Sequence, residues 1–142
     1  MRVMVLVKGN EDTEAGTPPD TEMLTEMGKF NEELVKAGIM LDGEGLHPSS
    51  RGARIQFSGD QRNVIDGPFT ETKELVAGYW VWQVRDLDEA IEWAKRCPNP
   101  TGAEGVLELR PVFELDDFGD NVTPEVRERD ERLRKEIEEQ QS

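Results

Sequence analysis

The sequence has very little cysteine and histidine, and this scarcity excludes several kinds of site. Cys97 is the single cysteine among the 142 residues, so no disulfide can form within the chain and a zinc site built from cysteines is excluded. His47 is the single histidine, which makes a dedicated transition-metal site improbable. We therefore expect no metal, and a reducing, cytoplasmic location.

Long apolar runs are also absent. The run around Leu75–Val84 is far shorter than the roughly 20 residues that a membrane-spanning helix needs. Met1 leads directly into a strand-like segment, so neither a membrane partner nor a signal segment is expected. The sequence lacks a dinucleotide fingerprint and a phosphate-loop lysine, so no cofactor is predicted.

Positive charge is scarce. Asp and Glu number 31 against 17 Lys and Arg, which gives a formal net charge of −14. A surface with this balance repels a phosphate backbone, so nucleic acid is not an expected partner. The length is sufficient for one core that folds without metals or disulfides.

The spacing of apolar residues predicts a series of short strands. They are expected at Met1–Val7, Ile39–Leu46, Ala53–Phe57, Asn63–Ile65, Glu74–Val84 and Gly105–Phe113. In the second strand, Gly43 and Gly45 predict a bulge or a close backbone neighbour. Residues 9–19 have no periodicity and are predicted to form a polar loop.

Two amphipathic helices are predicted between the strands. The first begins at Asp20 or Thr21 and ends before Gly38, which suits the position after a helix C-terminus. The second follows a capping box that starts at Asp86, and Pro98 stops it.

This order of elements predicts an α+β fold of ferredoxin-like topology, in which an antiparallel sheet carries its helices on one face. Two helices separated by antiparallel strands match this split β-α-β arrangement better than a Rossmann alternation. The other face of such a sheet needs cover. A second copy of the sheet can supply it, so we expect a homodimer that pairs through the sheet faces.

The chain changes character after Phe118. Thr123 can cap a charged helix with Pro124 at its first position, and acid–base pairs at i,i+4 spacing support that helix. We therefore divide the chain into a domain over residues 1–118 and a charged helical extension over residues 119–142. The helix either lies on its own or its partner's body, or forms a solvated tail.

One stretch of sequence is highly specific for a known protein family. The run Asp66-Gly67-Pro68-Phe69-Thr70-Glu71, followed by Val76-Ala77-Gly78-Tyr79-Trp80, resembles the DGPF-signature branch of the YCII-related family. The similarity extends to Gly45–Ser50 and to Leu109–Val112, and covers residues 1–118. It implies a dimeric α+β barrel. Members of the family are mostly uncharacterised, and many DGPF proteins are encoded near extracytoplasmic-function sigma factors.

The resemblance also implies a catalytic pair, His47 and Asp66, because a histidine–aspartate pair has been proposed as catalytic in some members of the family. A histidine held by a carboxylate can serve as a general base near neutral pH. The structural alternative is a histidine that bonds to backbone, beside a turn. In that turn Asp66 bonds to backbone amides, Gly67 permits a positive φ and Phe69 fills the core.

Three further side chains are candidates for binding a small molecule. Arg54 and Arg110 are cations in an acidic chain and can bind an anion through paired hydrogen bonds, and Tyr79 offers a hydroxyl group. The alternatives are surface ion pairs for the arginines and core packing for Tyr79.

Three functions remain open from the sequence. The first is a cofactor-free enzyme in which His47, oriented by Asp66, transfers a proton, as in an isomerase or lyase step. The second is a non-catalytic module that binds a small ligand or a protein, with a regulatory role linked to sigma factors as one form of it. The third is an accessory dimer whose charged tail contacts a partner.

Overall fold

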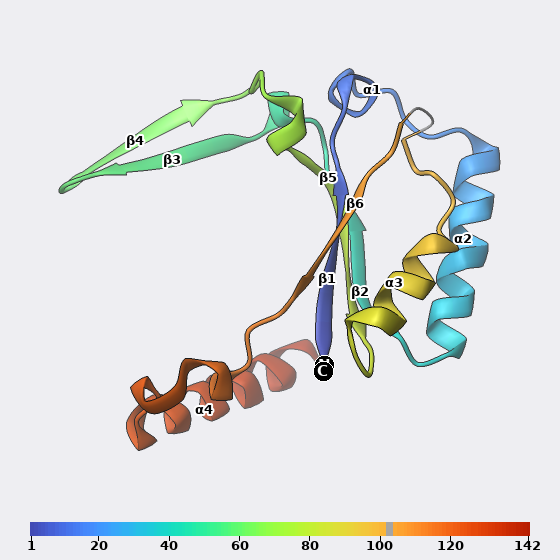
Figure 1. The fold of residues 1–142 in the computed structure, drawn as a ribbon. Helices are drawn as coiled ribbons and strands as arrows, with labels where there is room; N and C mark the ends of the chain where they lie inside the picture. Colours follow the sequence, from blue (N-terminus) through green and yellow to red (C-terminus); the bar gives the residue numbers. More distant parts are fainter. Residues whose placement is uncertain (102–103) are drawn as a thin grey trace. The chain divides into compact units, whose positions relative to one another are not determined.

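The computed structural model describes residues 1–101 and 104–142 (Figure 1). The chain forms two compact units, unit 1 at Met1–Pro111 and unit 2 at Val112–Ser142. No helix in the described part of the chain has the length and apolar character needed to cross a bilayer.

Unit 1 is built from strands and helices that alternate along the chain. Its strands are β1 (Arg2–Lys8), β2 (Met40–Gly45), β3 (Ala53–Ser58), β4 (Gln61–Asp66), β5 (Val76–Gln83) and β6 (Leu107–Pro111). Its α-helices are α1 (Glu11–Glu14), α2 (Thr21–Lys36) and α3 (Leu87–Lys95), and short 3-10 helices cover Ser49–Arg51 and Thr72–Glu74. The two long helices and all six strands fall where the sequence predicts them.

Four strands form an antiparallel sheet in the order β2-β5-β1-β6. Strand β5 separates β1 from β2, and β1 separates β5 from β6, so each β-α-β unit is split by a strand of the other. Figure 1 shows α2 and α3 on the same side of this sheet. The predicted α+β class with an antiparallel sheet is therefore confirmed.

The core lies between the sheet and its helices. Alternate residues of β1 are buried, which is the period of two that a strand imposes on its side chains. The buried apolar residues are Val3, Val5, Val7, Phe30, Leu34, Ile39, Trp80, Trp82, Val84 and Ala90. The ring of Phe30 meets Trp80 and Trp82 edge-on, at centroid distances of 6.0 and 6.3 Å, which is a favourable aromatic geometry.

Of two glycines that the sequence singles out, Gly38 fits the prediction and Gly43 departs from it. Gly38 follows α2 with a φ of 73°, as the position after a helix C-terminus requires. A Cβ at Gly43 would lie 2.7 Å from Cδ1 of Trp80, so the close neighbour is a side chain. The pairing of β2 with β5 shifts between Met40 and Asp42, just before the glycines at which we expected a bulge.

Strands β3 and β4 form a separate two-stranded hairpin, which we call the arm (residues 53–66). Every residue of its two strands is exposed. In Figure 1 the arm projects from the sheet on the side opposite α2 and α3.

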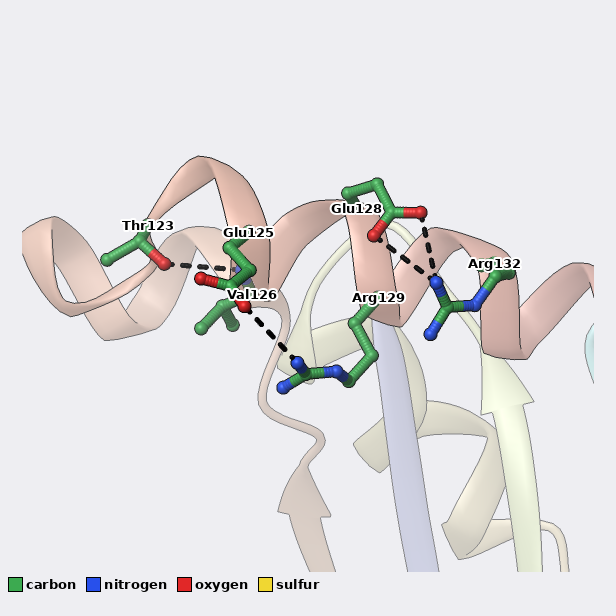
Figure 2. Close-up of polar contacts among 6 residues, drawn as sticks. All are labelled: Thr123, Glu125, Val126, Glu128, Arg129 and Arg132. Carbon is green, nitrogen blue, oxygen red and sulfur yellow. Dashed lines mark hydrogen bonds and ion pairs between the residues drawn. The ribbon is translucent and has the colours of Figure 1, made fainter.

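Unit 2 consists of a short 3-10 segment at Leu115–Asn121 and helix α4 (Pro124–Gln141). The Oγ1 atom of Thr123 accepts a hydrogen bond from the backbone N of Val126 at 3.2 Å and thereby caps the helix (Figure 2).

Ion pairs run along the exposed sides of α4. Figure 2 shows two of them, Arg129 with Glu125 at 3.5 Å and Arg132 with Glu128 at 3.3 Å. They have the i,i+4 spacing that stabilises an isolated helix by a few tenths of a kcal/mol per pair.

Candidate functional site

Several predicted site residues gather where the arm joins the body of unit 1. We call this place the root, and define it as His47–Gly52 and Asp66–Phe69 together with Glu14 of α1. Ala53 pairs with Asp66 at the end of the hairpin, and the backbone N of Gly67 donates to the carbonyl of Gly52 at 3.0 Å. The hairpin register therefore brings the two sequence segments of the predicted pair to one place.

Ser49 connects three parts of the root. Its backbone N donates to Oε1 of Glu14 at 3.1 Å, and its hydroxyl donates to the other oxygen of the same carboxylate. The hydroxyl oxygen also accepts a hydrogen bond from the backbone N of Phe69 at 3.0 Å. A charged acceptor makes the bonds to Glu14 stronger than neutral ones, so Ser49 is held firmly.

The role of Glu14 was missed because residues 9–19 were predicted to be a loop, and that prediction is wrong over α1. The side chain of Asn10 accepts from the backbone N of Thr13 at 2.9 Å, and the hydroxyl of Thr13 accepts from the backbone N of Asn10 at 2.8 Å. This reciprocal capping stabilises a single helical turn that has no apolar face. The spacing of Asn10 and Thr13 was the available signal.

Gly67 is required for a different reason from the one predicted. The glycines with positive φ in the described residues are Gly16, Gly38, Gly59 and Gly119, so the predicted positive φ at Gly67 is wrong. A Cβ at Gly67 would lie 1.7 Å from the carbonyl oxygen of Ser49 and 2.6 Å from its carbonyl carbon. Glycine stands here because the backbone of Ser49 passes directly against it.

His47 is exposed at the root and contacts an arginine. Nη1 of Arg51 lies 3.1 Å from Nδ1 and 3.0 Å from Nε2 of the imidazole. Asp66 is exposed as well, and in residues 1–101 and 104–142 no hydrogen bond or ion pair joins it to His47. The structure thus brings the two segments together while the imidazole has an arginine as its neighbour.

Arg54 lies over the ring of Phe69, with its guanidinium carbon 3.8 Å from the ring centroid. The prediction that Phe69 fills the core is wrong, because this side chain lies outside the layer between sheet and helices and is only half-buried. Stacking uses the face of the guanidinium group, so its N–H edges can still donate to a ligand.

Tyr79 and Arg110 lie on the sheet and outside the root. The hydroxyl of Tyr79 donates to Oδ2 of Asp42 at 3.2 Å. This hydrogen bond, and next the charge of Asp42, raise the pKa of Tyr79 above its ordinary value. Tyr79 is half-buried on the face opposite the helices, so the core-packing alternative is wrong, and Arg110 pairs with Glu108 at 3.4 Å.

The sheet face opposite the helices, which we call the open face, has an apolar centre between charged margins. Strand register aligns two rows across it, Asp42–Val81–Met4–Arg110 and Glu44–Tyr79–Leu6–Glu108. Because α2 and α3 lie on the other side, the four central side chains remain partly exposed in unit 1 (Figure 1).

Metal ligands do not cluster in the described residues: no group of three or more His, Cys, Asp and Glu side chains there could hold a metal ion. Two surface hollows of unit 1 lie along α3, one of them lined by Cys97, and both are away from the root. Burial raises the pKa of the Cys97 thiol to about 11, so this cysteine is a poor nucleophile at neutral pH.

The part of the chain that is similar to known proteins includes both the root and the open face. The sequence pattern of the YCII-related domain matches residues 1–116. An uncharacterized protein of Rhizobium meliloti (strain 1021) is 30% identical over 93 residues, which are 66% of this chain and 75% of that protein. The family match includes all of unit 1 and ends before α4.

Proposed function

Because the chain belongs to the YCII-related family, we propose that it is a cytoplasmic homodimer that binds a small anionic molecule at the root of the arm. The run Asp66-Gly67-Pro68-Phe69 supports the further proposal that the chain belongs to the DGPF-signature branch of that family. In this proposal two open faces pack against each other and form the dimeric α+β barrel.

The open face supports the dimer by its self-complementary pattern. A twofold axis parallel to the strands sets the β2 edge of one copy against the β6 edge of the other. Asp42 then meets the partner's Arg110. In the next row Glu44 meets the partner's Glu108, and Arg110, which lies 3.4 Å from Glu108 in its own chain, offsets that repulsion.

The observation that carries ligand binding is the contact of Arg51, in place of Asp66, with the ring of His47. The guanidinium group of Arg51 supplies hydrogen-bond donors at the root, and no carboxylate is bonded to the imidazole in the described residues. Arg54 adds a stacked guanidinium at the same place. Fixed guanidinium groups are well suited to bind a carboxylate or a phosphate, since they donate paired hydrogen bonds in a planar fork.

The single histidine makes this proposal easy to test by NMR. We expect acetate, succinate or inorganic phosphate to shift the His47 imidazole signals of the wild type in a saturable way. Arg54→Gln should remove the effect. Arg62→Gln is the matched control, because Arg62 donates to backbone carbonyls at the arm tip. Equal responses in both variants, or no saturable response in the wild type, would contradict ligand binding at the root.

A second candidate function is proton transfer by His47 with Asp66, as in an isomerase or lyase. The shared position of both residues at the root favours it. The two functions differ in one measurement: if His47 acts without Asp66, its imidazole signals follow the same course with pH in Asp66→Asn as in the wild type. A displaced course would show an electrostatic pair and favour the enzyme. Many DGPF proteins are encoded near sigma factors, and a dimer that binds a ligand is compatible with a regulatory role linked to them.

A further inference from the structure

The arm carries an apolar face that its own unit does not cover. Ile55 pairs with Val64 and Phe57 pairs with Arg62, and directly opposed residues of an antiparallel pair share one face. The exposed fractions are 51% for Ile55, 66% for Val64 and 70% for Phe57. The guanidinium group of Arg62 lies 4.5 Å from the ring centroid of Phe57 and leaves most of it open.

The opposite face of the arm is mainly polar, with Arg54, Gln56, Asn63 and Ile65 on it. A two-stranded hairpin that projects into water is marginally stable on its own. Large apolar side chains gathered on one side of such a hairpin mark a surface that packs against another molecule.

We propose that the apolar face of the arm packs on the body of a second copy of the chain, so that each protomer clasps the other. This inference rests on the proposed dimer. Its first support is the direction of the arm, which leaves the sheet on the side opposite the helices (Figure 1). That is the side of the open face, where the proposed partner lies.

Charge gives the second support. Residues 53–66 hold Arg54 and Arg62 against Asp60 and Asp66, a net charge of zero, so the formal charge of −14 lies on the rest of the chain. A neutral arm is not repelled by the acidic body of a second copy, whereas an acidic arm would be. The same acidic body repels an anionic membrane or a nucleic acid, which makes these weaker occupants.

The clasp also links the root to the dimer. The arm and the root share the backbone on both sides of Ala53 and Asp66. Fixing the arm on a partner therefore fixes His47 and Arg51 as well. Ligand binding and dimer formation are linked in this way, and each should strengthen the other.

A pair of arm variants tests the clasp by sedimentation equilibrium. Phe57→Asp places a negative charge on the apolar face, and Asn63→Asp makes the same charge change on the polar face. We expect Phe57→Asp to weaken the dimer about tenfold or more, and Asn63→Asp to change it by less than about twofold. Equal dimer affinities for the two variants would overturn the clasp. Circular dichroism establishes that both remain folded.

A third variant separates failure of the clasp from failure of the dimer. Leu6→Asp disrupts the open face and leaves the arm unchanged. A wild type that is monomeric at every concentration would refute the dimer, and the clasp with it. A wild-type dimer that Leu6→Asp dissociates and Phe57→Asp leaves intact would refute the clasp alone.

Hydrogen exchange gives an independent readout of what covers the arm. Protection of residues 53–66 should rise with protein concentration, in step with the dimer. Protection that is independent of concentration, or that appears only with vesicles of anionic lipid, would overturn the assignment to a second copy.

Discussion

Replacing Gly67 with alanine tests how tightly the root is built. The new Cβ would lie 1.7 Å from the carbonyl oxygen of Ser49, which is far inside van der Waals contact. Neither the backbone of Ser49 nor that of Gly67 can move easily. Ser49 is held by Glu14 and by the backbone N of Phe69, and the backbone N of Gly67 is bonded to Gly52. The backbone must therefore move and break at least one of these bonds.

The expected cost follows from overpacking, which typically destabilises a protein by about 1–3 kcal/mol. Because the contact is with backbone on both sides, we expect the upper end, about 3 kcal/mol. For a domain of this size that lowers the midpoint of thermal unfolding by about 6–12 °C.

Urea unfolding followed by tryptophan fluorescence measures this change, since Trp80 and Trp82 lie in the core. Both proteins must be compared at one concentration, because a dimer gains stability by association. Gly28→Ala is the matched control: nothing lies within 4 Å of its new Cβ, and alanine in a helix should stabilise α2 by about 0.5–1 kcal/mol. A Gly67→Ala protein within about 0.5 kcal/mol of the wild type would refute the close contact at the root.

Three further predictions concern single side chains. Asp42→Asn should lower the raised pKa of Tyr79 toward its ordinary value, because the carboxylate favours the protonated phenol; the single tyrosine makes an absorbance titration specific, and an unchanged midpoint would contradict the contact. Cys97, with a pKa of about 11, should react with a thiol reagent at mildly alkaline pH on the order of a hundredfold more slowly in the native protein than in urea, and equal rates would contradict its burial. Folding raises the pKa of the Cys97 thiol above its value in the unfolded chain. The stability that goes with the protonated thiol is therefore fully present at a pH below the unfolded pKa and is lost as pH rises through about 11. Ser49→Ala should destabilise the protein by about 1–3 kcal/mol, and a Glu14→Gln change added to it should cost much less than it does alone; additive costs in urea unfolding would show that the two residues act independently.

Much of the architecture could be predicted because it follows from the local periodicity of apolar residues. The alternation of β1 and the helical spacing in α2 report directly which side of each element meets the core. Gly38 could be predicted for the same reason, since the geometry after a helix C-terminus is a local property.

The root was harder to predict because its contacts join residues far apart in the sequence. Helix α1 has a single turn and no apolar face, so periodicity could not find it or place Glu14 beside Ser49. The glycine at Gly67 was foreseen as a turn residue, but the close approach of Ser49 depends on tertiary structure. The hairpin register predicts that His47 and Asp66 lie near each other, yet it does not determine which neighbour the imidazole contacts.

Pairing through the open face is the central claim, and sedimentation equilibrium of four proteins tests it most directly. Leu6→Asp changes the centre of the open face, and Leu24→Asp makes the same change on α2, where Leu24 is 59% exposed. Val81→Asp provides a second variant of the open face, and circular dichroism establishes that each protein is folded. We expect a dimer for the wild type and for Leu24→Asp, and a monomer for Leu6→Asp and for Val81→Asp. A monomeric wild type, or a Leu6→Asp protein that remains dimeric, would contradict pairing through the open face.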